Sequence, residues 1–223
     1  MRITLPGLTS AELATSADAS QGLVIAPDIF GLRPLYDDLV QRLASEWSMA
    51  VVAVEPFPGR ELGPEIEPRF AAVASLDDRV IRRDLEAGAD VLLGHLPAGA
   101  RVGLLGFCMG GMYCHVSSPS SSFDRIVSFY GMIRVPEAWR SSTHGEPLDH
   151  LTNGGHAERV LAIIGERDHY TPPDDVDALA ATGVSVVRYA DAEHGFAHDA
   201  LRPAHRAEDA ADAFSRAHAW LTH

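Results

Sequence analysis

Six short hydrophobic runs, separated by helical patterns, constrain the fold more than any other feature of this sequence. The runs are rich in Val, Ile and Leu and are nearly continuous, which is typical of parallel strands buried on both faces. Their alternation with helical patterns predicts an α/β fold, a mostly parallel sheet with helices on both faces. The expected strands are residues 22–29, 49–57, 101–108, 125–131, 159–168 and 184–194.

Helices are expected between these strands. Pro34 opens a pattern with apolar residues at helical spacing, and proline suits the first position of a helix. Another helix is expected after Pro173. The remaining helical patterns are residues 69–96, broken near 76–78, and residues 205–223.

Composition bounds the class of protein. A chain of 223 residues that is 46% hydrophobic suits a single domain, residues 1–223. No run of about 18 apolar residues and no leader-like N-terminus is present, so no membrane partner and a cytoplasmic location are expected. With 18 basic and 31 acidic residues, the net charge of -13 argues against nucleic acid as a partner. A monomer or homodimer is expected.

The chain has two cysteines, Cys108 and Cys114. Six helical residues span about 9 Å along the axis, which is too far for a disulfide. The spacing also differs from the usual zinc-binding pairs. We therefore expect one cysteine to be chemically active and the other to be packed.

Cys108 lies in the segment Gly-Phe-Cys-Met-Gly-Gly, which follows an expected strand and precedes a helical pattern. Glycines two residues before and two after the nucleophile are typical of a nucleophile elbow, because the strand must turn sharply into the helix. A buried structural cysteine is the alternative. The elbow predicts an oxyanion hole formed by the backbone N–H of Met109 and, from the segment after the first parallel strand, that of Ile29.

A catalytic thiol needs a base, and His194 follows the last expected strand, where the histidine of a triad belongs in the order nucleophile, acid, histidine. An acid that orients it should end the preceding strand. Asp168 is preferred there over Glu166, because turn residues follow it directly. Of the remaining histidines, His144, His150 and His156 lie in a polar segment, residues 139–158, which is interpreted as a surface loop without a metal site.

The segments APDIFGLRPLYDDLVQRLA, VGLLGFCMGGM, SFYG, IIGERDHYTP and AEHGFAH occur in this order. Together they resemble the dienelactone hydrolase family of α/β hydrolases, whose nucleophile is a cysteine. The resemblance covers most of the chain. It implies a triad of Cys108, His194 and Asp168 and an oxyanion hole of Ile29 and Met109.

The chain also departs from the family. The family glutamate that modulates the thiol is replaced by Asp28, and His198 stands near the position of an arginine that binds a substrate carboxylate. The resemblance therefore makes Asp28 the thiol-modulating residue and His198 and Arg33 the expected substrate-binding residues. The alternatives are an acid that caps a turn of the loop for Asp28 and a surface charge for Arg33. The other arginines that could compensate are Arg69, Arg79, Arg82 and Arg83.

Two further departures concern the fold. The family usually opens with an antiparallel hairpin, whereas this chain is expected to reach its first parallel strand almost at once and to form a smaller sheet. The helix after the elbow should be cut short by the serine-rich residues 117–122, which leaves the pocket more open.

The resulting prediction is a hydrolase of small esters or lactones that acts through a Cys108 thioester and needs no cofactor or metal. Thioesters, amides and nitriles stay open as substrates. A non-catalytic scaffold is one alternative, and a redox sensor that uses Cys108 is another. The sensor would need a resolving cysteine, and Cys114 is expected on the wrong part of the helix.

Overall fold

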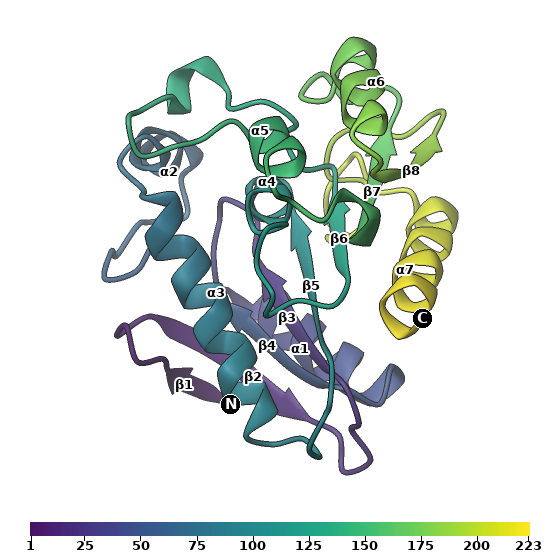
Figure 1. Cartoon of the computed structure of the whole chain (residues 1–223). Coiled ribbons are helices and arrows are strands. Elements are labelled where there is room, and N and C mark those ends of the chain that lie inside the picture. The colour runs from purple at the N-terminus through teal and green to yellow at the C-terminus, as the bar shows by residue number, and fades with distance from the viewer.

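The computed structural model describes residues 1–223 and contains one eight-stranded sheet with helices on both faces (Figure 1). The strand order is β1-β2-β4-β3-β5-β6-β7-β8, and the ladder is parallel from β4 to β8. This confirms the expected α/β-hydrolase architecture. The strands are β1 (Arg2–Thr4), β2 (Ser10–Thr15), β3 (Gly22–Ala26), β4 (Ala50–Val54), β5 (Val102–Phe107), β6 (Ile126–Phe129), β7 (Val160–Gly165) and β8 (Ser185–Tyr189).

The helices divide between the two faces of the sheet. Alternate strand residues point to opposite faces, so each face buries its own apolar cluster. One cluster lies under α1 and α7, and the other lies under α3, α4 and α6. In Figure 1, α3 crosses in front of the sheet and α1 lies behind it. The helices are α1 (Pro34–Glu46), α2 (Ile66–Val73), α3 (Asp78–Leu93), α4 (Met109–Val116), α5 (Pro147–Thr152), α6 (Pro173–Ala181) and α7 (Ala207–Thr222).

The expectation of a smaller sheet without an N-terminal hairpin is wrong. Strands β1 and β2 form an antiparallel hairpin, and β2 pairs antiparallel with β4. Both strands are short and largely polar, so they carry no continuous apolar run. The hairpin joins the sheet through the hydrogen bonds of β2 with the edge of β4, a long-range partner that local sequence does not reveal.

The segment 139–158 is only partly the surface loop that was expected. It contains α5, which packs against α4, and its Trp139 and Leu151 side chains are buried. The short helix after the elbow is confirmed, because α4 ends at Val116, just before the serine-rich residues. No helix of the structure is long and apolar enough to span a bilayer.

Candidate active site

Cys108 stands at the turn between β5 and α4 with φ 56° and ψ −118°, outside the regions favoured by residues that carry a Cβ. Its N–H donates to the Phe129 carbonyl oxygen at 3.0 Å, which holds the turn against β6. The turn is possible because glycines surround it: a Cβ on Gly110 would lie 2.0 Å from the Ala26 carbonyl oxygen. This strained, glycine-flanked geometry is that of a nucleophile elbow.

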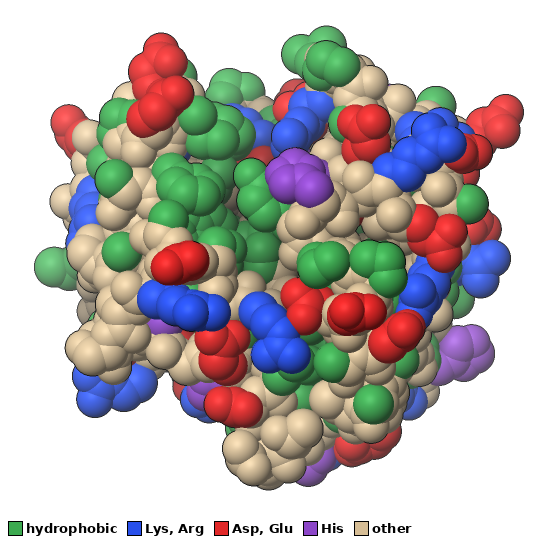
Figure 2. Space-filling view, turned by 90° about the horizontal axis from the view of Figure 1, so that it is seen from above, with side chains coloured by type: hydrophobic (Ala, Val, Ile, Leu, Met, Phe, Trp, Pro, Cys, Tyr) green, Lys and Arg blue, Asp and Glu red, His purple; other side chains and the backbone are tan.

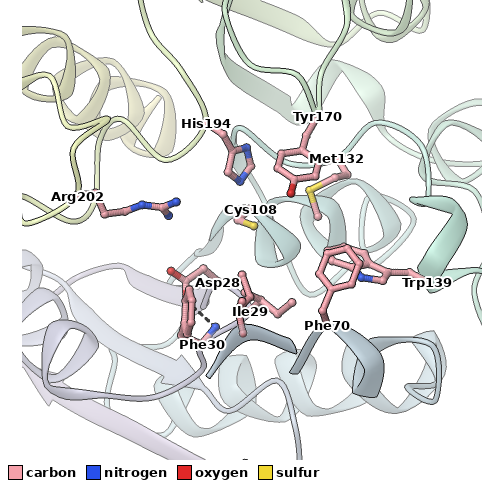
Figure 3. A pocket seen from close by; sticks show the side chains of 11 residues that line it. Asp28, Ile29, Phe30, Phe70, Cys108, Met132, Trp139, Tyr170, His194 and Arg202 are labelled. Atoms are coloured by element: carbon pink, nitrogen blue, oxygen red, sulfur yellow. Dashed lines mark hydrogen bonds between the residues drawn. The ribbon is translucent and has the colours of Figure 1, made fainter. Parts of the chain in front are cut away.

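His194 and Asp168 meet beside the cysteine. His194 Nδ1 lies 2.8 Å from Asp168 Oδ2, and both side chains are almost fully buried. His194 Nε2 is buried and has no hydrogen-bond partner, and Figure 3 shows the imidazole directly next to Cys108. Glu166, the other acid considered, is exposed. The structure therefore brings Asp168 to the histidine.

The environment of His194 favours the imidazolium. Burial alone lowers the pKa of His194, but the charge of the Cys108 thiolate and the hydrogen bond to Asp168 outweigh it and raise the pKa to about 10. A thiolate next to an imidazolium is the activated form of a cysteine nucleophile.

Two backbone N–H groups beside Cys108 have no acceptor within the chain, those of Ile29 and Met109. Met109 is the first residue of α4, where unpaired N–H groups and the helix dipole favour negative charge. Ile29 lines the same pocket as Cys108. The pair can therefore stabilise an oxyanion formed by attack of the sulfur.

Asp28 lines the pocket but its carboxylate is occupied elsewhere. Oδ1 accepts from the Phe30 N–H at 3.0 Å and from Arg33 Nη1 at 2.7 Å. Oδ2 accepts from Arg33 Nη2 at 3.0 Å and lies 2.8 Å from His198 Nε2. Four donors thus surround Asp28, and the Cys108 thiol is not among them.

His198 and Arg33 were expected to bind the substrate, but both side chains are engaged within the protein. The His198 side chain is fully buried, and its ring nitrogens face Asp28 and the Tyr130 hydroxyl. The Arg33 guanidinium is paired with Asp28. Neither residue has a free group for a substrate carboxylate, and neither lines the pocket with Cys108.

The pocket in front of Cys108 encloses about 460 Å³ including its open mouth. Seen from above, this end of the molecule has a hollow lined mainly by hydrophobic side chains (Figure 2). In Figure 3, Phe70 and Trp139 lie on one side of Cys108, and Arg202 points in from the other. The lining residues are Asp28, Ile29, Phe30, Ile66, Phe70, Cys108, Met132, Trp139, Tyr170, His194 and Arg202.

Sequence reasoning missed Arg202. It is the arginine of the pocket wall, and its guanidinium makes no hydrogen bond or ion pair within the chain. Gly195 leaves room for the guanidinium in this position, because a Cβ there would lie 2.6 Å from Arg202 Nη1. The compensating arginines that were expected lie outside the pocket wall. Arg202 is eight residues beyond His194 along an irregular loop, and no sequence periodicity links the two residues.

Comparison with known proteins gives a consistent result. Residues 9–223 match the model of the dienelactone hydrolase family. A carboxymethylenebutenolidase of Rhodococcus opacus is 28% identical over 218 residues, covering 89% of this chain and 80% of that protein. The chain spans 58% of a Bradyrhizobium protein named "Probable 2-oxo-3-(5-oxofuran-2-ylidene)propanoate lactonase", with 28% identity over 151 residues and 66% of this chain covered.

A solved structure agrees over the whole chain. The crystal structure titled "Putative Dienelactone Hydrolase" from Klebsiella pneumoniae superposes with a TM-score of 0.86 at 26% identity. The match covers 100% of this chain and 97% of the other. The fold is therefore shared along the whole chain.

Proposed function

The chain belongs to the dienelactone hydrolase family and is a hydrolase of ester or lactone bonds, and on that premise we propose that it acts by acyl transfer to Cys108. One observation carries the proposal. A strained cysteine, a carboxylate-oriented histidine and the free N–H of Ile29 lie together at one apolar pocket, and the free N–H of Met109 follows the cysteine directly in the chain.

The first half-reaction forms a thioester. The Cys108 thiolate attacks the carbonyl carbon, and the N–H groups of Ile29 and Met109 hold the oxyanion. The C–O bond to the leaving group then breaks, and the His194 imidazolium gives its proton to the leaving oxygen. In a lactone this oxygen stays attached to the acyl group, so the ring opens on the enzyme.

The second half-reaction is hydrolysis. Neutral His194 takes a proton from water, the water oxygen attacks the thioester carbon, and the C–S bond breaks. The product acid leaves, and the thiolate and imidazolium are restored. Asp168 accepts from the histidine throughout and fixes which ring nitrogen faces the sulfur.

We further propose that the substrate is a small ester or lactone that carries a carboxylate. Arg202 offers a guanidinium without a protein partner at one side of Cys108, and a guanidinium fork matches a carboxylate. The opposite side, with Phe70 and Trp139, suits an apolar part of the substrate.

The test compares p-nitrophenyl esters, simple lactones and dienelactone with wild type, Cys108→Ala and Arg202→Gln. Cys108→Ala should abolish turnover of every substrate. Arg202→Gln should raise KM for carboxylate-bearing substrates by about 10-fold or more, the scale of one lost charged hydrogen bond, and leave neutral esters unchanged. Turnover by Cys108→Ala would refute the nucleophile, and an equal effect of Arg202→Gln on neutral and anionic substrates would refute the carboxylate site.

A further inference from the structure

His194 and His198 lie on one loop, between β8 and α7, but they point to different places. His194 faces Cys108 in the pocket. The His198 side chain is fully buried and stacks on the Phe107 ring, with ring centroids 4.6 Å apart. The base of the proposed reaction and a buried second histidine are thus four residues apart on the same segment.

The hydrogen bonds of His198 fix its protonation. Nε2 lies 2.8 Å from Asp28 Oδ2, and since a carboxylate only accepts, Nε2 carries the proton. Burial lowers the pKa of His198 in spite of this bond, so the ring is neutral and Nδ1 accepts from the Tyr130 hydroxyl at 2.5 Å. Asp28 is a carboxylate, because the donors around it outweigh burial and hold its pKa well below the usual value.

Asp28 in turn orients the peptide that carries the Ile29 N–H. The Asp28 carbonyl oxygen accepts from the Gly31 N–H at 3.0 Å, and a planar trans peptide then directs the Ile29 N–H to the opposite side. The next peptide is held at both ends, by the bond from the Phe30 N–H to Asp28 Oδ1 and by Arg69, which donates to the Ile29 carbonyl oxygen at 3.2 Å.

The same network touches the catalytic histidine. The Tyr130 ring packs edge-on against His194, with centroids 5.2 Å apart, while its hydroxyl binds His198. A continuous chain of contacts therefore runs from the loop that carries the Ile29 N–H (residues 27–33, the oxyanion loop) to the base. Its members are Arg33, Asp28, His198 and Tyr130.

We propose that His198 is a positioning residue that holds the oxyanion loop in register with the loop that carries the base. The inference rests on the proposed function and adds a cause for the placement of the Ile29 N–H. His198 takes no part in proton transfer to the substrate, because both of its nitrogens are occupied by Asp28 and Tyr130.

The test separates oxyanion stabilisation from thiolate formation. Alkylation of Cys108 by iodoacetamide needs the thiolate and no oxyanion hole, whereas ester hydrolysis needs both. In His198→Phe, which retains the stacking on Phe107, kcat for a p-nitrophenyl ester should fall about 100-fold, the scale of one lost oxyanion donor. The alkylation rate and its pH profile should stay within twofold of wild type.

Two further variants keep the test decisive if His198→Phe does not fold. His198→Gln places an amide donor near Asp28 and should recover most of kcat. Tyr130→Phe removes one hydroxyl and should lower kcat by a smaller factor without changing alkylation. His205→Phe, on the same loop and without a side-chain hydrogen bond to the network, is the matched control and should leave both rates unchanged.

Parallel loss of hydrolysis and alkylation in His198→Phe would overturn the proposal, because the histidine would then act through the thiolate or the fold. Unchanged hydrolysis would overturn it as well. Failure of the proposed function is a separate result: it would appear as turnover by Cys108→Ala, whatever His198 does.

Discussion

His144 and Asp78 form a buried charged pair that links the two segments from which the apolar side of the pocket is built. His144 Nδ1 lies 2.8 Å from Asp78 Oδ1, and Nε2 lies 2.8 Å from the Val73 carbonyl oxygen. Both partners only accept, so both nitrogens must donate and the ring is an imidazolium. The pair joins the segment that follows Trp139 to the start of α3, just after the helix that carries Phe70.

This pair predicts stability that depends on pH. The hydrogen bond to Asp78 raises the pKa of His144 in spite of burial, and the Val73 carbonyl and the charge of Asp77 raise it further. The contribution is complete below the ordinary histidine pKa of about 6.5 and is lost as the pH rises through the higher folded-state value. His144→Phe should lower the free energy of unfolding by about 3 kcal/mol at pH 6 and by less at pH 9, as measured by urea denaturation.

His156→Phe is the control for this prediction. His156 lies in the same segment and also faces a carboxylate, that of Glu158, but the two side chains are 42% and 70% exposed. Its loss should cost under about 0.5 kcal/mol. A His144→Phe effect that is equally small, or independent of pH, would contradict the buried charged pair.

Asp168→Asn should reduce kcat by about 10³- to 10⁴-fold, because an amide cannot hold the imidazolium or select the same tautomer. Glu166→Gln, two residues away and exposed, should leave kcat unchanged.

Wild type should lose activity toward alkyl esters as the pH rises through about 10, because the raised pKa of His194 places deprotonation of its imidazolium there. Asp168→Asn should shift that alkaline limb to lower pH; a limb that stays in place would contradict the role of Asp168.

Gly110→Ala should prevent formation of the elbow, since its Cβ would lie 2.0 Å from the Ala26 carbonyl oxygen and 2.5 Å from that of Pro27. Backbone atoms cannot move aside as a flexible side chain can, so we expect loss of stability by about 3 kcal/mol or more together with loss of turnover. Gly63→Ala meets nothing within 4 Å and should keep both stability and turnover. Thermal unfolding and ester hydrolysis of the two variants provide the measurement.

Thiol labelling should distinguish the two cysteines. Burial raises the pKa of Cys114 well above its usual value, and its Sγ lies 3.3 Å from the Val127 carbonyl oxygen. Iodoacetamide at pH 8 should therefore modify Cys108 alone in the folded protein and both residues in urea, as read by peptide mass spectrometry. Rapid labelling of Cys114 in the folded state would revive it as a resolving cysteine.

The sequence predicted those parts of the fold that depend on residues close together in the chain. Each of the six parallel strands has its own apolar run, and the elbow has glycines at fixed offsets from Cys108. The β1-β2 hairpin has neither an apolar run nor such glycines, because it is stabilised by the pairing of β2 with the distant strand β4. The burial of Trp139 could not be predicted for a similar reason: it packs against Phe70 of α2, about 70 residues earlier in the chain.

The candidate site divides in the same way. Cys108, Asp168 and His194 follow the ends of β5, β7 and β8, so their positions can be predicted from the order of strands along the chain. The environments of Asp28, His198 and Arg202 depend on how loops that are distant in the sequence meet at the pocket, which no local pattern reveals. The cytoplasmic location and the monomeric or homodimeric state stay predictions.

The apolar side of the pocket is built from segments that add no strand to the sheet. Ile66 and Phe70 come from α2, and Trp139 comes from the connection after β6. The groups proposed to react, in contrast, stand at the ends of β3, β5, β7 and β8. Exchange of these two peripheral segments would therefore alter which molecules enter while the proposed reacting groups stayed in place, so a new substrate range would need segment replacement and no change to the proposed triad.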